Sequence, residues 1–114
     1  MKRIEAFLQP HRVSKVVAAL HGLPRFPGFT VLDAHGQGHG RGHGGHYVYT
    51  EIDGVRYRQH SMLIVLCEDS EATRIAELIA SAAHTGNAGD GLVIVSNVCQ
   101  VRFVREARSE GEAS

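Results

Sequence analysis

Apolar and polar side chains alternate at the start of the chain and then recur at helical spacing. The alternation over residues 2–9 predicts a strand that ends before Pro10. Residues 12–21 carry apolar side chains at the i, i+3, i+4, i+7 spacing of an amphipathic helix, with Gly22 as its stop signal. Residues 29–34 return to a strand pattern, so the first part of the chain is predicted to be β-α-β.

The second part repeats this order after a long intervening segment. Its predicted elements are, in chain order, a hairpin with strands 47–52 and 55–57 around Asp53 and Gly54, a strand over 62–67, a helix that begins at Asp69 or Ser70 and ends at Gly86, and strands over 92–95 and 98–104. Two β-α-β halves predict an α+β fold, a ferredoxin-like βαββαβ sandwich in which two helices cover one face of an antiparallel sheet.

The length, net charge, apolar runs and cysteine spacing of the chain limit which kinds of protein it can be. The chain has 114 residues, enough for one domain, and a formal net charge of zero, which argues against nucleic-acid binding. No apolar run reaches the roughly 18 residues of a membrane span, and the N-terminus lacks the apolar segment of a signal peptide. Cys67 and Cys99 form no Cys-x-x-Cys pair. We expect a cytoplasmic protein with reduced cysteines and no direct membrane insertion.

A Gly/His segment, residues 35–46, separates the two halves. It contains six glycines and four histidines and no apolar side chain, so it cannot contribute to a core. Imidazole is the commonest protein ligand of transition metals. One interpretation is a loop that becomes ordered when it binds Zn, Cu, Ni or Co through His35, His39, His43 and His46. The other is a flexible protein-docking loop in which the histidines are solvated spacers.

A second glycine-rich segment, residues 85–91, connects the second predicted helix to the strand after it. Its sequence is Thr-Gly-Asn-Ala-Gly-Asp-Gly. Converging backbone N–H groups in such a loop bind anions, whereas Asp90 can also shape the turn by accepting hydrogen bonds from its own backbone. No Gly-Lys-Ser/Thr follows, so the segment is not a Walker motif. A phosphate-binding loop and a tight connection both remain open.

The same loop carries a family resemblance. The pattern Thr-Gly-x-x-Gly-Asp-Gly-x-Val-x-Val that begins at Thr85 resembles the B-loop signature of P-II signalling proteins. The first ten residues and the segment after Gly28 resemble that family's first two strands, and the similarity extends over residues 1–105. It implies a ferredoxin-like homotrimer with adenine-nucleotide sites between subunits and a long T-loop, about residues 36–58, that docks on partner proteins. The composition of residues 106–114 predicts a flexible tail.

The resemblance also implies which residues form the nucleotide site. The residues that match the loop that cradles the phosphates are Thr85, Gly86, Gly89, Asp90 and Gly91. Thr30 and Gly36 match positions near the adenosine and phosphates. Arg105 matches an arginine that reaches the phosphates from a neighbouring subunit.

Several positions depart from the family pattern. A second phosphate-binding arginine is replaced by Phe103, the lysine after Gly-Asp-Gly is Leu92, and the T-loop glutamine used for Mg-ATP and 2-oxoglutarate aligns with Gly40. The T-loop uridylylation motif is absent. Each lost charged donor removes about 1.5–3 kcal/mol of phosphate binding. These departures predict weaker triphosphate binding, or a preference shifted toward ADP or AMP.

We therefore predict a PII-like signal-transduction protein and not an enzyme, because no His, Asp or Glu spacing defines a nucleophile or an acid–base pair. The predicted homotrimer binds ATP, ADP or AMP between subunits and regulates an enzyme or a membrane transporter through its T-loop, with transition-metal sensing by the loop histidines as an added role. The alternative is a nucleotide-independent, CutA-like metal-binding trimer. A third class is an interaction module that binds neither ligand.

Overall fold

The fold consists of one antiparallel sheet and two helices. The structure is a computed structural model that describes residues 1–37, 49–52 and 54–106. Its elements are, in chain order, β1 (Lys2–Leu8), η1 (Pro10–Arg12), α1 (Val13–His21), β2 (Thr30–Gly36), β3 (Tyr49–Ile52), β4 (Val55–Cys67), α2 (Asp69–Ala83), β5 (Gly91–Asn97) and η2 (Val104–Glu106), where η denotes a short 3-10 helix.

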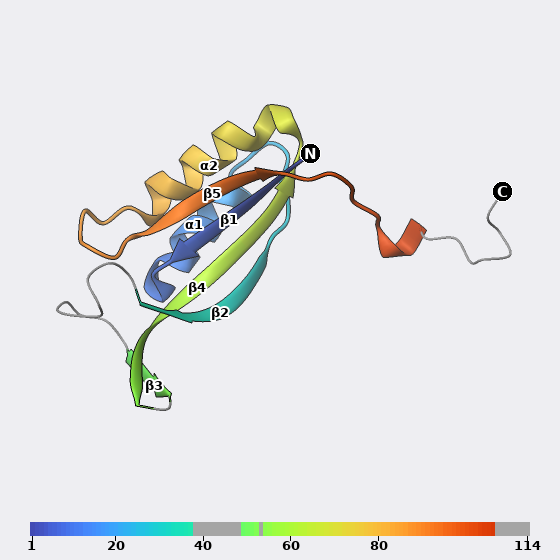
Figure 1. The fold of residues 1–114 in the computed structure, drawn as a ribbon. Helices are drawn as coiled ribbons and strands as arrows, with labels where there is room; N and C mark the ends of the chain where they lie inside the picture. Colours follow the sequence, from blue (N-terminus) through green and yellow to red (C-terminus); the bar gives the residue numbers. More distant parts are fainter. Residues whose placement is uncertain (38–48, 53, 107–114) are drawn as a thin grey trace, which may run out of the picture.

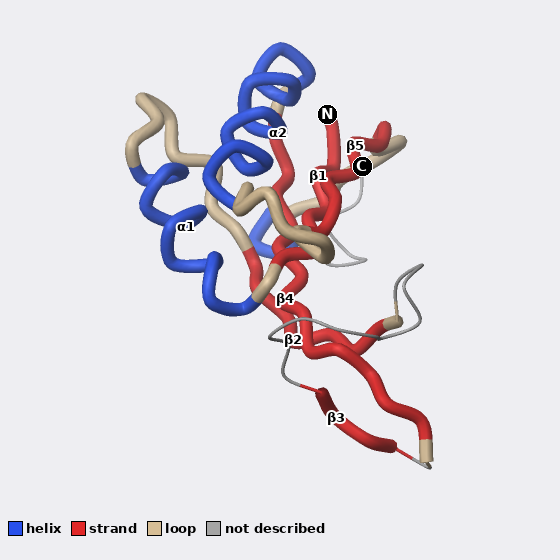
Figure 2. The backbone as a smooth tube through the Cα atoms, turned by 90° about the vertical axis from the view of Figure 1, so that its left-hand side faces the viewer, coloured by secondary structure: helices blue, strands red, loops and turns tan. Residues whose placement is uncertain are grey.

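The sheet has the strand order β2-β4-β1-β5, and β3 extends it locally by pairing with β4. All of these pairs are antiparallel. Both helices lie on the same side of the sheet (Figure 1 and Figure 2). The predicted α+β ferredoxin-like sandwich is thereby confirmed. Within the described ranges, no helix is long and apolar enough to cross a membrane.

The hydrophobic core lies between the sheet and the helices. Alternate residues of the central strands face the helices, because successive side chains of a strand point to opposite sides. The helices contribute apolar residues at helical spacing. The fully buried side chains include Ile4, Leu8, Val16, Leu20, Leu63, Val65, Ile75 and Ile79. These residues confirm both predicted amphipathic helices.

The opposite side of the sheet, termed the open face, is not covered by any described helix (Figure 2). Its apolar side chains are therefore partly exposed, with exposed fractions of 48% for Leu32, 55% for Leu92 and 41% for Ile94. The strand register aligns Leu32 with Met62, and Phe7 with both Met62 and Leu92. These side chains form an apolar row across the four long strands, of the kind that marks an interface.

One strand is longer than the pattern predicted. The predicted strands 55–57 and 62–67 are parts of the single strand β4, which has 13 residues. Residues 58–61 between them are polar, and this interrupted the apolar pattern. Their backbone nevertheless pairs with the end of β2, so the ladder continues through them. The predicted hairpin is confirmed for the described residues, since Ile52 pairs with Val55, whereas positions 47, 48 and 53 of the prediction lie outside them.

Two predictions near the C-terminus are wrong. Residues 98–104 do not form a strand: they leave the sheet after β5, and the last of them begins η2 (Figure 1). The N–H of Val98 still donates to the carbonyl oxygen of Met1 over 3.1 Å, but β1 begins at Lys2. Extended backbone has to find partners for its polar groups, and no described strand lies beside the residues after Val98. Helix α2 ends at Ala83 and not at Gly86, because His84 already has an extended backbone with φ −64° and ψ 130°.

Candidate functional site

The B-loop, residues 85–91, is shaped by the carboxylate of Asp90. The backbone N–H groups of Thr85 and Gly86 donate hydrogen bonds to Asp90 Oδ2 over 2.8 and 2.9 Å. The Thr85 hydroxyl donates to Asp90 Oδ1, and the N–H of Asn87 donates to the Thr85 hydroxyl oxygen over 3.2 Å. Asp90 therefore does shape the turn by bonding its own backbone. The N–H groups of Thr85 and Gly86 are engaged inside the loop in this conformation.

These contacts set the charge state of Asp90. The hydrogen bond from the Thr85 hydroxyl, followed by the one from the Thr85 backbone, holds the pKa of the Asp90 carboxyl below its ordinary value. The imidazole of His84 adds a weaker attraction, with Nδ1 at 3.5 Å from Asp90 Oδ2 and a side chain that is 73% exposed. The loop therefore holds an ionised carboxylate at neutral pH.

Glycine is required where the B-loop joins β5. Gly91 has φ +103°, a value that residues with a side chain rarely adopt. A Cβ atom at this position would lie 1.7 Å from the carbonyl oxygen of Phe7. This close approach exists because β5 begins directly against the end of β1, where Leu8 pairs with Gly91.

Two side chains from the turn after β1 hold the loop from outside. Gln9 Nε2 donates to the carbonyl oxygen of Gly89 over 3.1 Å. Arg12 Nη2 donates to the carbonyl oxygens of Ala82 and His84 over 2.7 and 3.5 Å. Neither residue was predicted from the sequence, because their contacts span 70 to 80 positions of the chain and no local pattern indicates such pairs.

A cavity of about 330 Å³ lies beside the loop, between the end of α2 and the start of β5. Its wall is mostly apolar, with an imidazole and a carboxylate at one side. The lining residues are Leu8, Ala80, Ala83, His84, Asp90, Gly91, Leu92 and Val93. A pocket of this type can take a ligand with an apolar body and a few polar groups.

The predicted nucleotide residues lie at different places on one chain. Gly36 ends β2 at the same end of the sheet as the B-loop. The register shows this, because one row across the strands joins Asp33, Ser61, Leu8 and Gly91. Thr30 begins β2 at the edge of the sheet and pairs with Ile64, which in turn pairs with Glu5 halfway along β1. Arg105 belongs to η2, beyond the far end of β5 (Figure 1). A single chain thus does not bring Arg105 to its own B-loop.

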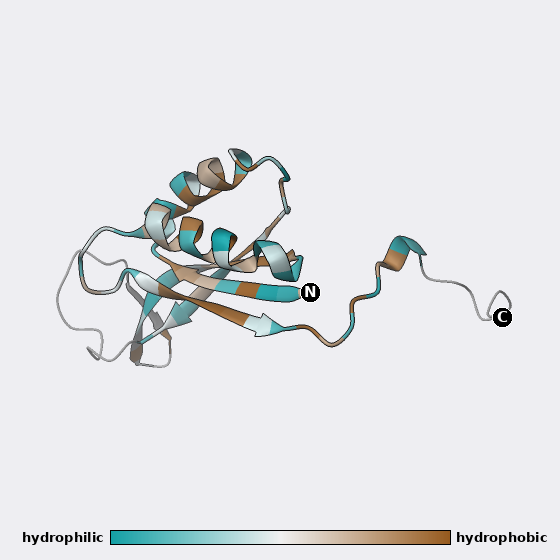
Figure 3. Ribbon diagram, turned by 90° about the horizontal axis from the view of Figure 1, so that it is seen from above, coloured by the Kyte–Doolittle hydropathy of each residue, from teal (hydrophilic) through white to brown (hydrophobic). Residues whose placement is uncertain are grey.

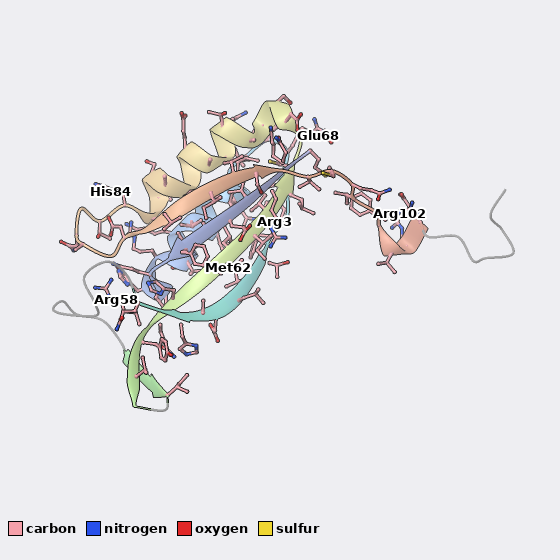
Figure 4. All side chains as sticks on the ribbon, in the orientation of Figure 1. Arg3, Arg58, Met62, Glu68, His84 and Arg102 are labelled. Carbon is pink, nitrogen blue, oxygen red and sulfur yellow. The ribbon has the colours of Figure 1, made fainter. Side chains whose placement is uncertain are left out.

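The opposite positions of these groups can be followed in Figure 4, where His84 lies at the B-loop end and Arg102 lies on the C-terminal segment. Residues 98–106, termed the C-terminal arm, extend away from the sheet. The arm exposes 59% of Phe103 and 89% of Val104. The apolar character of β5 continues into it (Figure 3).

Of the four predicted metal ligands, one lies in the described part of the chain. His35 is exposed on β2, where it pairs with Gln59, whereas His39, His43 and His46 lie outside the described residues. In the part of the chain that the structure describes, no three His, Cys, Asp or Glu side chains are grouped so that they could hold a metal ion. Metal binding by the Gly/His segment stays a prediction.

Comparison with known proteins decides the family. Residues 1–108 match the sequence model of the family described as Nitrogen regulatory protein P-II. The chain belongs to the P-II family. The nitrogen regulatory protein P-II of Azospirillum brasilense is 36% identical over 118 residues, with 99% of each chain covered. That of Rhizobium meliloti is 36% identical over 110 residues, with 92% of each chain covered.

A more distant relative is GlnB-like protein 1 of the nitrogen fixation nifHD region of Methanothermococcus thermolithotrophicus, 29% identical over 106 residues, with 92% of this chain and 94% of that protein covered. P-II proteins are signalling regulators and not enzymes. As a family they are trimers that regulate partner proteins, and they bind adenine nucleotides.

Proposed function

We propose that this P-II family member is a homotrimeric regulator that binds an adenine nucleotide between subunits and transmits its binding to a partner enzyme or transporter through the T-loop. The observation that carries the proposal is the B-loop, whose internal hydrogen bonds and tight contact with β1 present a preformed turn at the edge of a cavity. Preformed loops lose little entropy when a ligand binds.

Two surfaces support assembly into a trimer. The open face carries an apolar row that no described helix covers, and the C-terminal arm exposes Phe103 and Val104. Burial of apolar area is worth about 25 cal/mol per Å², so both surfaces favour contact with further copies of the chain. Small domains often gain stability in this way.

The position of Arg105 supports a site that is shared between subunits. Arg105 and the B-loop of one chain lie at opposite ends of β5. If both contact the same phosphates, the arginine has to come from a neighbouring copy. The proposed site therefore combines the B-loop of one subunit with Arg105 of the next, together with Thr30 and Gly36.

Two apolar residues stand where the family has cations near the phosphates. Leu92 follows the B-loop directly and is 55% exposed, and Phe103 on the C-terminal arm is 59% exposed. Neither can donate a hydrogen bond, and each missing charged donor weakens phosphate binding by about 1.5–3 kcal/mol. We infer that the site discriminates less in favour of ATP over ADP and AMP than a site with both cations.

The direct test is titration calorimetry of the purified chain with ATP, ADP and AMP, each with Mg²⁺, combined with light scattering. The proposal expects one nucleotide site per subunit in a particle of three chains. Leu92→Lys should strengthen ATP binding relative to AMP, whereas Leu92→Met, the matched control, should not. A monomer, or the absence of heat with all three nucleotides, would overturn the proposed function.

We include metal sensing by the T-loop in the proposal, supported by the four histidines at 35, 39, 43 and 46. Zn, Cu, Ni or Co would order the loop and change the surface that a partner meets. Thermal-shift measurements with each metal, alone and with nucleotide, test this part. A shift with metal but with no nucleotide would favour the CutA-like alternative, a metal-binding trimer independent of nucleotide.

A further inference from the structure

We propose that Gln9 and Arg12 are positioning residues that set nucleotide affinity without contacting the nucleotide. They lie on either side of Pro10 and His11, in the turn between β1 and α1. From there they hold both ends of the B-loop. The inference rests on the proposed function, because it assigns to these residues control of the same site.

Gln9 holds the end of the loop that leads into β5. Gln9 is only 8% exposed, and its side-chain amide donates to the carbonyl oxygen of Gly89 over 3.1 Å. The C=O and N–H of a trans peptide point in opposite directions. The bond from Gln9 therefore determines which way the Gly89–Asp90 peptide faces, and with it the direction from which the Asp90 side chain enters the loop.

Arg12 holds the end of the loop that leaves α2. The last carbonyl groups of a helix have no partner within the helix, and a cation beside them is favoured by the helix dipole. Arg12 Nη2 meets this need by donating to the carbonyl oxygen of Ala82 in the last turn, and it also donates to the carbonyl oxygen of His84, which follows the helix. Because His84 precedes Thr85 directly, the guanidinium fixes the point at which the B-loop begins.

The internal and external contacts have separate effects. The hydrogen bonds from Thr85 and Gly86 to Asp90 define the shape of the loop, but they do not place it relative to the sheet. Placement comes from Gln9, from Arg12 and from the contact of Gly91 with Phe7. A ligand that requires a precise loop position is sensitive to all three, since small displacements of binding groups weaken a preorganised site.

The experiment compares Gln9→Met and Arg12→Met with the natural chain and with Lys15→Gln, an exposed position on α1. Methionine keeps the length of the glutamine side chain and the apolar stem of the arginine side chain, and it removes the donors of both. Calorimetry with ATP and Mg²⁺, at a temperature where every variant is folded, should show Kd raised about tenfold in each methionine variant. Arg12→Lys keeps a cationic donor group and should recover most of the affinity, and Lys15→Gln should match the natural chain.

A second measurement separates positioning from general destabilisation. In the nucleotide-free protein, hydrogen exchange of the amides of residues 84–90 should accelerate in the methionine variants, while exchange in the central strands β1 and β4 stays unchanged. An unchanged Kd in both variants, while the natural chain binds nucleotide, would overturn this inference alone. An increase in Kd that Arg12→Lys does not relieve would assign Arg12 a purely structural role. Failure of the natural chain to bind any nucleotide would overturn the proposed function and this inference with it.

Discussion

At the scale of single residues, the B-loop depends on the carboxylate of Asp90 and on a glycine, which has no side chain, at position 91. Asp90 gathers the N–H groups of Thr85 and Gly86, and Gly91 allows β5 to start in contact with the backbone of Phe7. The family resemblance implies that both residues bind nucleotide, and the sequence also offered Asp90 as a residue that shapes the turn. The geometry confirms the turn-shaping role of Asp90 and adds a structural requirement at Gly91, so substitutions at 90 and 91 act on the loop before they act on a ligand.

Gly91→Ala should lower the free energy of unfolding by about 2–4 kcal/mol, because the added methyl meets backbone that cannot rotate away and φ is unfavourable. Gly28→Ala is the matched control. Gly28 also has positive φ, but no atom lies within 4 Å of its ideal Cβ, so only a backbone cost of about 1–2 kcal/mol applies. Urea unfolding at one protein concentration measures both. Equal losses would contradict the close contact with Phe7.

Asp90→Asn should reduce stability in a pH-dependent way. The folded-state pKa of Asp90 is lowered from 3.8, first by the Thr85 hydroxyl, so the ionised form stabilises the fold. That contribution is complete above the ordinary pKa and is lost as pH falls through the lower folded value. The urea midpoints of the natural chain and the variant should differ most at neutral pH and converge in acid below about pH 4. A difference that stays constant into acid would show that the carboxylate charge is not involved.

At the scale of elements, α2 links the core to the B-loop. Its buried face holds Ile75 and Ile79, and its last residue, Ala83, is also buried. The helix end is therefore fixed against the sheet, and the loop begins from a rigid point. Arg12 adds a hydrogen bond to the carbonyl of Ala82 at the same place. This arrangement explains why the helix stops before the glycine at 86.

Which face of α2 packs against the sheet can be tested with two adjacent residues. Ile79 has no exposed surface, whereas its neighbour Leu78 is only partly buried. Ile79→Ala should cost about 2–5 kcal/mol of unfolding free energy, as expected for a cavity in a packed core. Leu78→Ala should cost distinctly less. A reversed order would mean that the helix presents a different face to the sheet.

At the scale of the whole molecule, no described helix covers the open face, and the C-terminal arm exposes apolar side chains. The arm leaves β5 and extends away from the sheet (Figure 1 and Figure 3), and Phe103 and Val104 on it are exposed. Both surfaces are accounted for if copies of the chain pack together. The oligomeric state is then part of the proposed nucleotide site, because Arg105 lies on this arm.

The double variant Phe103→Asp, Val104→Asp should weaken self-association, because charged side chains would have to be buried where apolar ones pack. We expect light scattering to show a smaller mean mass at micromolar concentration. Far-UV circular dichroism should stay unchanged, since neither residue belongs to the core. Glu106→Gln, on the same arm, serves as the control. An unchanged mass would place the subunit contacts elsewhere.

Much of the fold followed from local patterns in the sequence. Alternation in residues 2–9 and helical spacing in residues 12–21 reflect the periods of the two backbone structures, so they could be read without knowledge of tertiary contacts. The same reasoning split β4 at residues 58–61 and placed a strand at 98–104. Strand formation depends on a neighbouring strand as well as on the side chains, and sequence alone does not show the neighbour.

The sequence by itself determined the fold class, the glycine-rich turn at 85–91 and the family to which its motif points, because each is a property of adjacent residues. The tertiary structure alone decided that Asp90 bonds the loop backbone, that Gln9 and Arg12 hold the loop from a turn some 70 to 80 positions away, and that Arg105 lies far from the B-loop of its own chain. The Asp90 contacts depend on the conformation that the loop adopts, which its composition left open between two alternatives. The other facts concern distances between segments remote in the sequence, and such distances are set by the packing of the sheet and helices.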